Sequence, residues 1–145
     1  MKAKTDLIQA RLDAGSHETA RREAISALKT ATTSEAVELR FQLHTACREL
    51  KDGRACKSTL EELVPENTDQ KIERLLRQAE DCKIFSKGMF YFESDEKKQG
   101  LSQWEYFDRM GKKGKALLEE ARPLVQTPEQ QARFKQADII CNEGV

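Results

Sequence analysis

The chain has 145 residues, of which 38% are hydrophobic and 34% charged, and its 25 basic and 25 acidic side chains give a formal net charge of zero. This length predicts a single domain with one core. A net charge of zero provides no long-range attraction to nucleic acid or to an anionic membrane surface. The sequence has no apolar run of membrane-spanning or signal-peptide length. We therefore expect a chain without membrane contact, in the cytosol or nucleus, and take the cytoplasm as its location.

Apolar residues recur at steps of three and four along most of the chain, which predicts an all-α fold. The alternation that is typical of half-buried strands is nearly absent. We expect about seven helices, at about residues 3–14, 17–30, 35–51, 54–64, 68–85, 103–122 and from 128 onward.

The expected helix ends follow from local signals. Gly15 is the stop of the first helix, and Ser16, Ser34 and Ser102 are the N-caps of the second, third and sixth. Pro65 ends the fourth helix, because the residue before a proline resists the helical conformation. Most connections have about two to five residues, so consecutive helices form antiparallel hairpins.

Between the fifth and sixth helices lies a longer connection, within the stretch GMFYFESDEKKQG. Seven of the nine aromatic residues of the chain fall between Phe85 and Phe107. Two interpretations remain open. In one, Phe90, Tyr91 and Phe92 fill space over the end of the hairpin, while Phe107 continues an apolar face formed with Gly111, Gly114, Leu118 and Ala121. In the other, some rings are exposed interface anchors, since neighbouring helical residues point about 100° apart; these are Tyr91, Phe92, Trp104 and Tyr106.

Small residues also recur at regular distances. Gly15, Ala20, Ala24 and Ala27 follow Ile8, and the spacing Gly-x11-Pro occurs twice, as Gly53 with Pro65 and as Gly111 with Pro123. This pattern resembles the tetratricopeptide repeat, although Ile8 stands where that family usually has a small residue and Thr32 stands where it often has proline.

The resemblance implies a single domain, residues 1–145, in which about three hairpins and a final helix stack as a right-handed superhelix. Gly53 and Gly111 are 58 residues apart, whereas the family repeats every 34 or so. The third hairpin is therefore overlong, with an insertion at about residues 86–103. Mid-helix glycines such as Gly111 and Gly114 cost about 1 kcal/mol each relative to alanine, so we expect them to allow close helix packing.

Tetratricopeptide domains bind peptides or proteins, usually on the concave face formed by the first helix of each pair. The resemblance thus implies a non-catalytic interaction module, such as an adaptor, chaperone or assembly factor. On this face the chain offers Gln9, Asp13, Glu38, Gln42 and Thr45.

Two alternatives remain. One is self-association into a homo-oligomer through the aromatic insertion. The other is a contact with single-stranded nucleic acid through residues 104–115, where Arg109, Lys112, Lys113 and Lys115 follow aromatic residues. Nearby acidic residues and the zero net charge favour a solvated helix face over this contact.

Residues for catalysis or metal binding are few. His44, Cys47 and Cys56 could supply three metal ligands, but their spacing matches no common zinc module. The sequence contains no glycine-rich phosphate loop, nucleophile elbow or HExxH motif. The four cysteines are expected to be buried and reduced. We therefore expect no enzyme activity, no metal and no cofactor.

Overall fold

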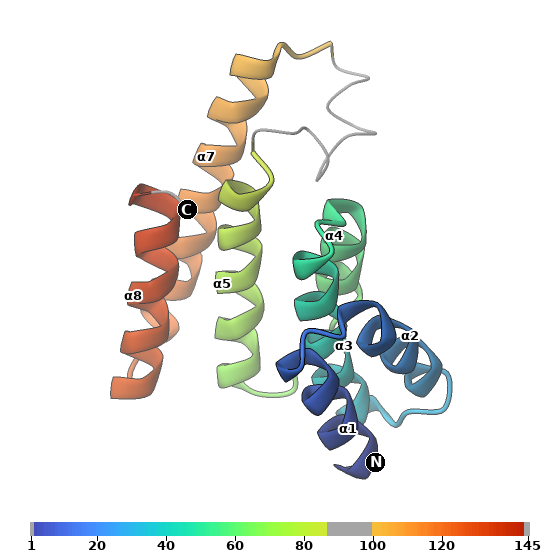
Figure 1. Ribbon diagram of the computed structural model, residues 1–145. Helices are drawn as coiled ribbons and strands as arrows, with labels where there is room; N and C mark the ends of the chain where they lie inside the picture. The colour runs from blue at the N-terminus through green and yellow to red at the C-terminus, as the bar shows by residue number, and fades with distance from the viewer. Residues whose placement is uncertain (1, 87–99, 144–145) are drawn as a thin grey trace. The chain divides into compact units, whose positions relative to one another are not determined.

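The computed structural model describes residues 2–86 and 100–143, and in these ranges the chain is all-α, with no strand (Figure 1). The predicted all-α class is thereby confirmed, and the predicted helix bounds agree to within about two residues. None of the helices in these ranges combines the length and the apolar content that crossing a membrane requires. The elements are α1 (Lys2–Asp13), α2 (His17–Leu28), α3 (Thr33–Glu49), α4 (Gly53–Glu62), α5 (Thr68–Ile84), α7 (Gln103–Ala121), the 3-10 turn η1 (Arg122–Leu124) and α8 (Pro128–Glu143).

The chain divides into two compact units, an N-terminal unit (Met1–Glu66) and a C-terminal unit (Asn67–Val145). Each unit has its own set of packed helices. The superhelical stacking and the single domain that the repeat resemblance implies therefore stay predictions.

In the N-terminal unit, α1 packs on α2 and α3, α2 packs on α3, and α3 packs on α4. Alanine fills many of the contact positions: Ala20 and Ala24 of α2 and Ala46 of α3 are fully buried. Because these side chains are small, the helix backbones can approach closely. The side-chain amide of Gln42 adds a polar link from α3 to α1, because its Nε2 donates a hydrogen bond of 2.8 Å to the carbonyl oxygen of Thr5.

The start of α3 differs from the predicted one. Thr32 is the N-cap, and its hydroxyl accepts a hydrogen bond of 3.3 Å from the backbone N–H of Glu35. Ser34, the predicted cap, lies in the first turn of α3 and donates from its hydroxyl to Glu66. Ser16 occupies the N-cap position of α2, as predicted, but makes no side-chain capping bond.

In the C-terminal unit, α5, α7 and α8 lie side by side (Figure 1), and each helix packs on the other two. The turn η1 follows directly after α7 and packs against it. Aliphatic side chains from the three helices form the core of this unit, whose buried members are Ile72, Leu75, Leu76, Ala79, Leu118, Ala121 and Ala137.

Gly114 marks the closest approach of α7 to α5. A Cβ atom at this position would lie 3.3 Å from the carbonyl oxygen of Ala79 and 3.4 Å from the Cβ of Cys82, both on α5. At Gly114 the two helices are therefore packed as closely as predicted, with little room for a side chain. Gly111 does not share this role, because a Cβ there would meet no atom of the described residues within 4 Å.

A cluster of four charged side chains joins α8 to α5, which we call the Arg133 cluster: Arg133, Glu73, Glu80 and Arg77. The guanidinium of Arg133 donates to both oxygens of Glu73, at 2.8 and 3.1 Å, and to both oxygens of Glu80, at 2.9 Å each. Arg77 Nε donates to Glu73 at 2.7 Å. Glu80 is only 3% exposed, so its charge depends on such contacts for compensation.

Replacing Arg133 with methionine should destabilise the chain by about 3 kcal/mol, because the buried Glu80 carboxylate loses two charge-assisted hydrogen bonds. The measurement is urea-induced unfolding at neutral pH. The matched control is Lys112→Met, which removes an exposed ion pair with Asp108 and should change stability little. Equal effects of the two substitutions would contradict the role assigned to the cluster.

The Arg133 cluster should also make stability depend on pH. Burial raises the pKa of the Glu73 carboxyl, but the hydrogen bonds and charges of Arg133 and Arg77 outweigh burial and hold the pKa below its usual value. The stability from Glu73 is therefore complete above the unfolded-state pKa of about 4.3 and is lost as pH falls through the lower folded-state pKa. The difference in unfolding free energy between wild type and Arg133→Met should shrink as pH falls from 7 to 3. A difference that stays constant over this range would count against the ion pair as its source.

The two glycines of α7 should respond oppositely to alanine. Gly111→Ala should stabilise the chain by up to about 1 kcal/mol, because alanine favours the helix and the space is open. Gly114→Ala should be destabilising, because its new Cβ presses on the backbone of α5. Thermal or urea unfolding of the two variants in parallel measures this difference, and a Gly114→Ala chain at least as stable as Gly111→Ala would refute it.

Candidate functional site

The five polar residues that were predicted to contact a partner on the concave face differ in their exposure. Gln9 and Asp13 are exposed neighbours on α1, where Gln9 Nε2 donates to Asp13 Oδ1 at 3.0 Å. Glu38 on α3 is also exposed. Gln42 is buried in its link to α1, and Thr45 is half-buried with its hydroxyl donating to the carbonyl of Phe41. Gln9, Asp13 and Glu38 are therefore the members that a partner could reach in this conformation.

The aromatic residues that were considered as interface anchors also differ in their exposure. Tyr91 and Phe92, like most of the predicted insertion, lie outside the described residues. Tyr106 is completely buried, so its ring belongs to the interior in this conformation. Trp104, two residues earlier, is 82% exposed and is the most exposed large hydrophobic side chain among the described residues.

Trp104 lies in the first turn of α7, and the sequence there forms a well-defined helix start. The hydroxyl of Ser102 accepts from the backbone N–H of Glu105 at 3.2 Å, and the Glu105 side chain accepts from the backbone N–H of Ser102 at 3.4 Å. This reciprocal capping box satisfies two backbone donors and defines the first turn. The predicted cap at Ser102 is thus confirmed, and it holds Trp104 on a regular helix.

A second ring supports Trp104 from the same side of α7. The rings of Trp104 and Phe107 meet edge to face, with centroids 6.3 Å apart and an interplanar angle of 74°. The ammonium of Lys83, near the end of α5, lies 5.4 Å from the centre of the Phe107 ring. We call these three residues the Trp104 surface. It combines an exposed indole with a half-buried ring and a lysine. Aromatic side chains are enriched at protein interfaces, whereas lysine is not.

The thiols below this surface are poorly suited to chemistry. A small cavity of about 40 Å³ lies beside Phe107 and includes Cys82 and Cys141 among its lining residues, which is room for no more than a few waters. Burial raises the pKa of the Cys82 thiol to about 12 and that of Cys141 to about 11. Both thiols are therefore protonated at neutral pH. The protonated thiol is a poor nucleophile, because the thiolate is the reactive form.

A larger pocket lies between α1 and α2 in the N-terminal unit, with a volume of about 260 Å³. We call it the α1–α2 groove. The sequence patterns did not predict it. The buried residues of α2 are all alanines, Ala20, Ala24 and Ala27, and Leu7 of α1 stays 48% exposed. The residues that line it are Lys4, Leu7, Ile8, Glu23, Ser26 and Ala27.

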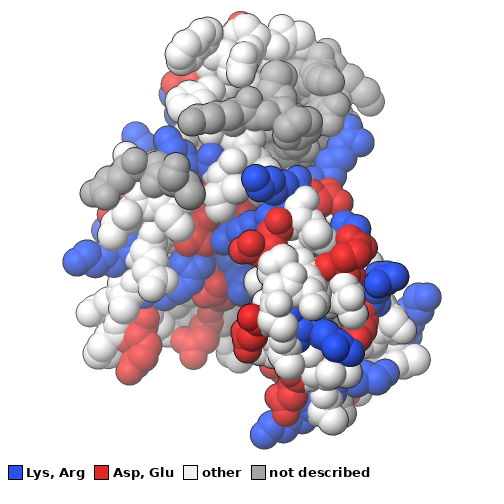
Figure 2. All heavy atoms as spheres, viewed as in Figure 1, with Lys and Arg blue, Asp and Glu red and all other residues white. Residues whose placement is uncertain are grey.

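The basic run in residues 104–115 does not form an uninterrupted cationic surface. Lys112 pairs with Asp108 at 2.9 Å on the exposed side of α7. On the face that Figure 2 shows, Lys and Arg side chains are interspersed with Asp and Glu side chains over both units. With Tyr106 buried, Trp104 and Phe107 are the rings that this segment can present.

Comparison of the chain with known proteins found no relative. No family model, curated protein sequence or solved structure matches this chain. The tetratricopeptide resemblance therefore remains a prediction, and functional inference depends on the surfaces just described.

Proposed function

We propose that the chain is a non-catalytic interaction module that binds a protein or peptide partner, with Trp104 as its principal contact. The observation that carries this proposal is the 82% exposure of Trp104. A tryptophan in water leaves a large apolar area uncovered, and tryptophan is among the residues most enriched at the energetic centres of interfaces.

The setting of Trp104 supports the same proposal. The capping box at Ser102 defines the backbone of the turn that carries Trp104, and the edge contact with Phe107 restricts the indole before any partner arrives. Restricting a side chain in advance reduces the entropy that binding would otherwise cost. The repeat resemblance points the same way, because tetratricopeptide domains act as adaptors, chaperones and assembly factors through partner binding.

Self-association through the same surface is the second candidate. It is favoured by the formal net charge of zero, because a chain without net charge has little long-range repulsion between its copies. A contact with single-stranded nucleic acid has less support, since Lys112 is already paired with Asp108.

Trp104→Ala should abolish partner capture. The assay is co-purification from native extract of three tagged chains: wild type, Trp104→Ala and the control Val64→Ala, which truncates another highly exposed side chain, in the N-terminal unit. Loss of an interface centre costs roughly 2 kcal/mol or more, so recovery of a specific partner should fall by at least about tenfold for Trp104→Ala alone. A partner recovered equally with all three chains would refute the role of Trp104.

Sedimentation velocity at several concentrations separates the two candidates. A chain that binds a different protein should sediment as a single species whose coefficient does not rise with concentration. If the sedimentation coefficient of wild type and of Val64→Ala rises with concentration and that of Trp104→Ala does not, the Trp104 surface is instead a site of self-association.

A further inference from the structure

α8 contributes less to the core of the C-terminal unit than α5 and α7 do. Ala137 is the one buried residue among its described side chains, whereas α5 has seven buried residues and α7 has five. Phe134 and Cys141 of α8 pack against this core but stay half-buried. Hydrophobic stabilisation is roughly proportional to the apolar area removed from water, so the apolar part of the attachment of α8 is small. Elements with few buried apolar contacts are the ones that open locally in folded proteins.

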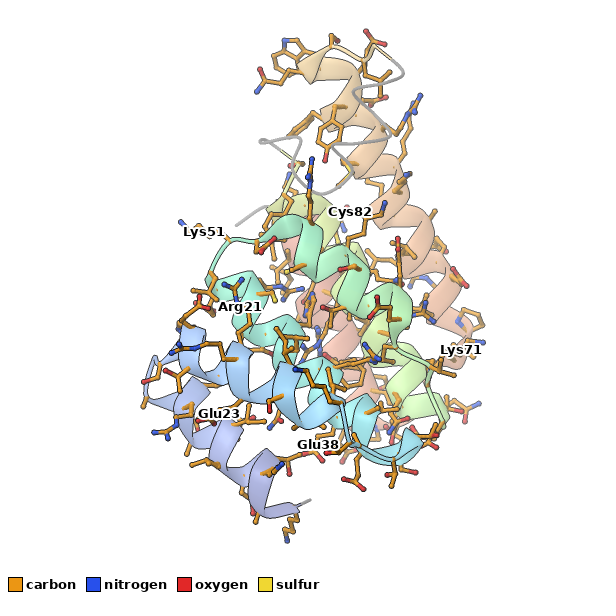
Figure 3. The ribbon with its side chains drawn as sticks, turned by 90° about the vertical axis from the view of Figure 1, so that its right-hand side faces the viewer. Arg21, Glu23, Glu38, Lys51, Lys71 and Cys82 are labelled. Atoms are coloured by element: carbon orange, nitrogen blue, oxygen red, sulfur yellow. The ribbon has the colours of Figure 1, made fainter. Side chains whose placement is uncertain are left out.

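Charged contacts add to the attachment of α8 to α5. The guanidinium of Arg133 donates four hydrogen bonds to the carboxylates of Glu73 and Glu80. Both carboxylates lie on α5 between Lys71 and Cys82, which Figure 3 labels near the two ends of that helix. Glu73 and Glu80 are seven residues apart, which corresponds to about 10 Å along a helix. A single side chain of α8 therefore joins two separate turns of α5.

The ion pairs of Arg133 resist the departure of α8 less than their number suggests. While α8 is docked, Glu80 is 3% exposed, so its charge is paired but largely removed from water. When α8 departs, the guanidinium of Arg133 regains its hydration and water reaches the carboxylates. The loss of this hydration in the docked state offsets much of the attraction between the charges. The cluster therefore determines where α8 docks, and it adds less to the free energy of opening than four hydrogen bonds would imply.

α5 and α7 have contacts with each other that do not involve α8. They pack side by side, and a Cβ atom at Gly114 of α7 would lie 3.3 Å from the carbonyl oxygen of Ala79 on α5. Tyr106 and Met110 of α7 are fully buried and lie outside the core cluster on which α8 packs. Residues 125–127, between η1 and α8, lie outside the helices and provide a hinge about which α8 can move.

We propose that α8 is a releasable helix. It opens from α5 and α7 as a unit while those two helices stay packed, and Arg133 is the latch that sets how often it opens. Opening uncovers the part of the C-terminal core to which Ala137 belongs. The inference goes beyond the proposed function, because α8 carries no residue of the Trp104 surface.

Native-state amide hydrogen exchange of the full-length ¹⁵N-labelled chain, followed by NMR at several low urea concentrations, tests the proposal. The amides of α8 should exchange through an opening that is at least about tenfold more populated than the one that exposes the amides of α5 and α7. Its population should also rise less steeply with urea, because the release of one helix exposes less surface than the unfolding of the unit. Amides of all three helices that share one opening population and one urea dependence would overturn the proposal.

Met110→Ala should separate the opening of α8 from the unfolding of the unit. The substitution removes a buried side chain from α7, so it should increase exchange of the α5 and α7 amides at least about tenfold. The opening of α8 should stay as in wild type, because α5 and α7 remain packed in its open state. An equal increase at the amides of all three helices would contradict a separate opening.

Arg133→Met should raise the population of the open state about 100-fold, because Glu80 is then buried without this partner only while α8 is docked. Adding Glu80→Met removes the stranded charge and should return the open population toward that of wild type. An open population that is unchanged in Arg133→Met, or equal in the single and double variants, would overturn the role of Arg133 as the latch.

Discussion

Close approach between helix backbones at small residues is the constraint on which both units depend. Alanines at the contact positions, such as Ala24, Ala46, Ala79 and Ala137, are all fully buried, and Gly114 brings α7 to within contact of the α5 backbone. A chain with 38% hydrophobic residues can then form close-packed interiors from small side chains. Trp104 is not part of these interiors and is 82% exposed.

Close packing alone leaves the position of α8 weakly determined. Among its described residues only Ala137 is fully buried, so few apolar contacts distinguish one register on α5 from another. The Arg133 cluster supplies that distinction, because Arg133 meets Glu73 and Glu80 together only when α8 lies at one height along α5. We infer that the cluster helps to fix this register, a role that buried charged groups have in some proteins.

The helix bounds could be predicted because each depends on neighbouring residues. Caps, glycine stops and prolines act within one turn, and the predicted caps at Ser16 and Ser102 occupy the expected positions. The start of α3 was misplaced because Thr32 and Ser34 are both good caps. Thr32 is selected by its extended backbone and by Glu35 three residues later, which its hydroxyl also contacts at 2.8 Å.

The buried face of α7 was only partly predicted, because its first two residues were placed one position too late along the helix. The predicted face began at Phe107 and Gly111, whereas the buried residues begin at Tyr106 and Met110. Both series include Gly114. A glycine has no side chain whose polarity would show which side of the helix is buried, so Gly111 and Gly114 could not distinguish the two series. The series of Tyr106, Met110, Gly114 and Leu118 at steps of four was visible in the sequence and identifies Tyr106 as an interior residue.

The α1–α2 groove was beyond prediction from the pattern. The lack of a partner for Glu23 Oε2 depends on the distance between two helices and on the rotamers of Arg11 and Glu23. A sequence gives only the residue types that could meet there. The pairing of each individual oxygen is a property of the packed hairpin.

Trp104 stands in solvent on a capped helix, and the proposed function depends on that exposure. Trp104 is the only tryptophan of the chain, so its fluorescence reports on this position alone. The decisive measurement is the emission maximum, together with quenching by acrylamide, of the dilute native chain and of the same chain in urea. We predict that the native emission and quenching closely resemble those of the unfolded chain. A strongly blue-shifted emission that acrylamide hardly quenches, in the free and dilute native chain, would contradict the account.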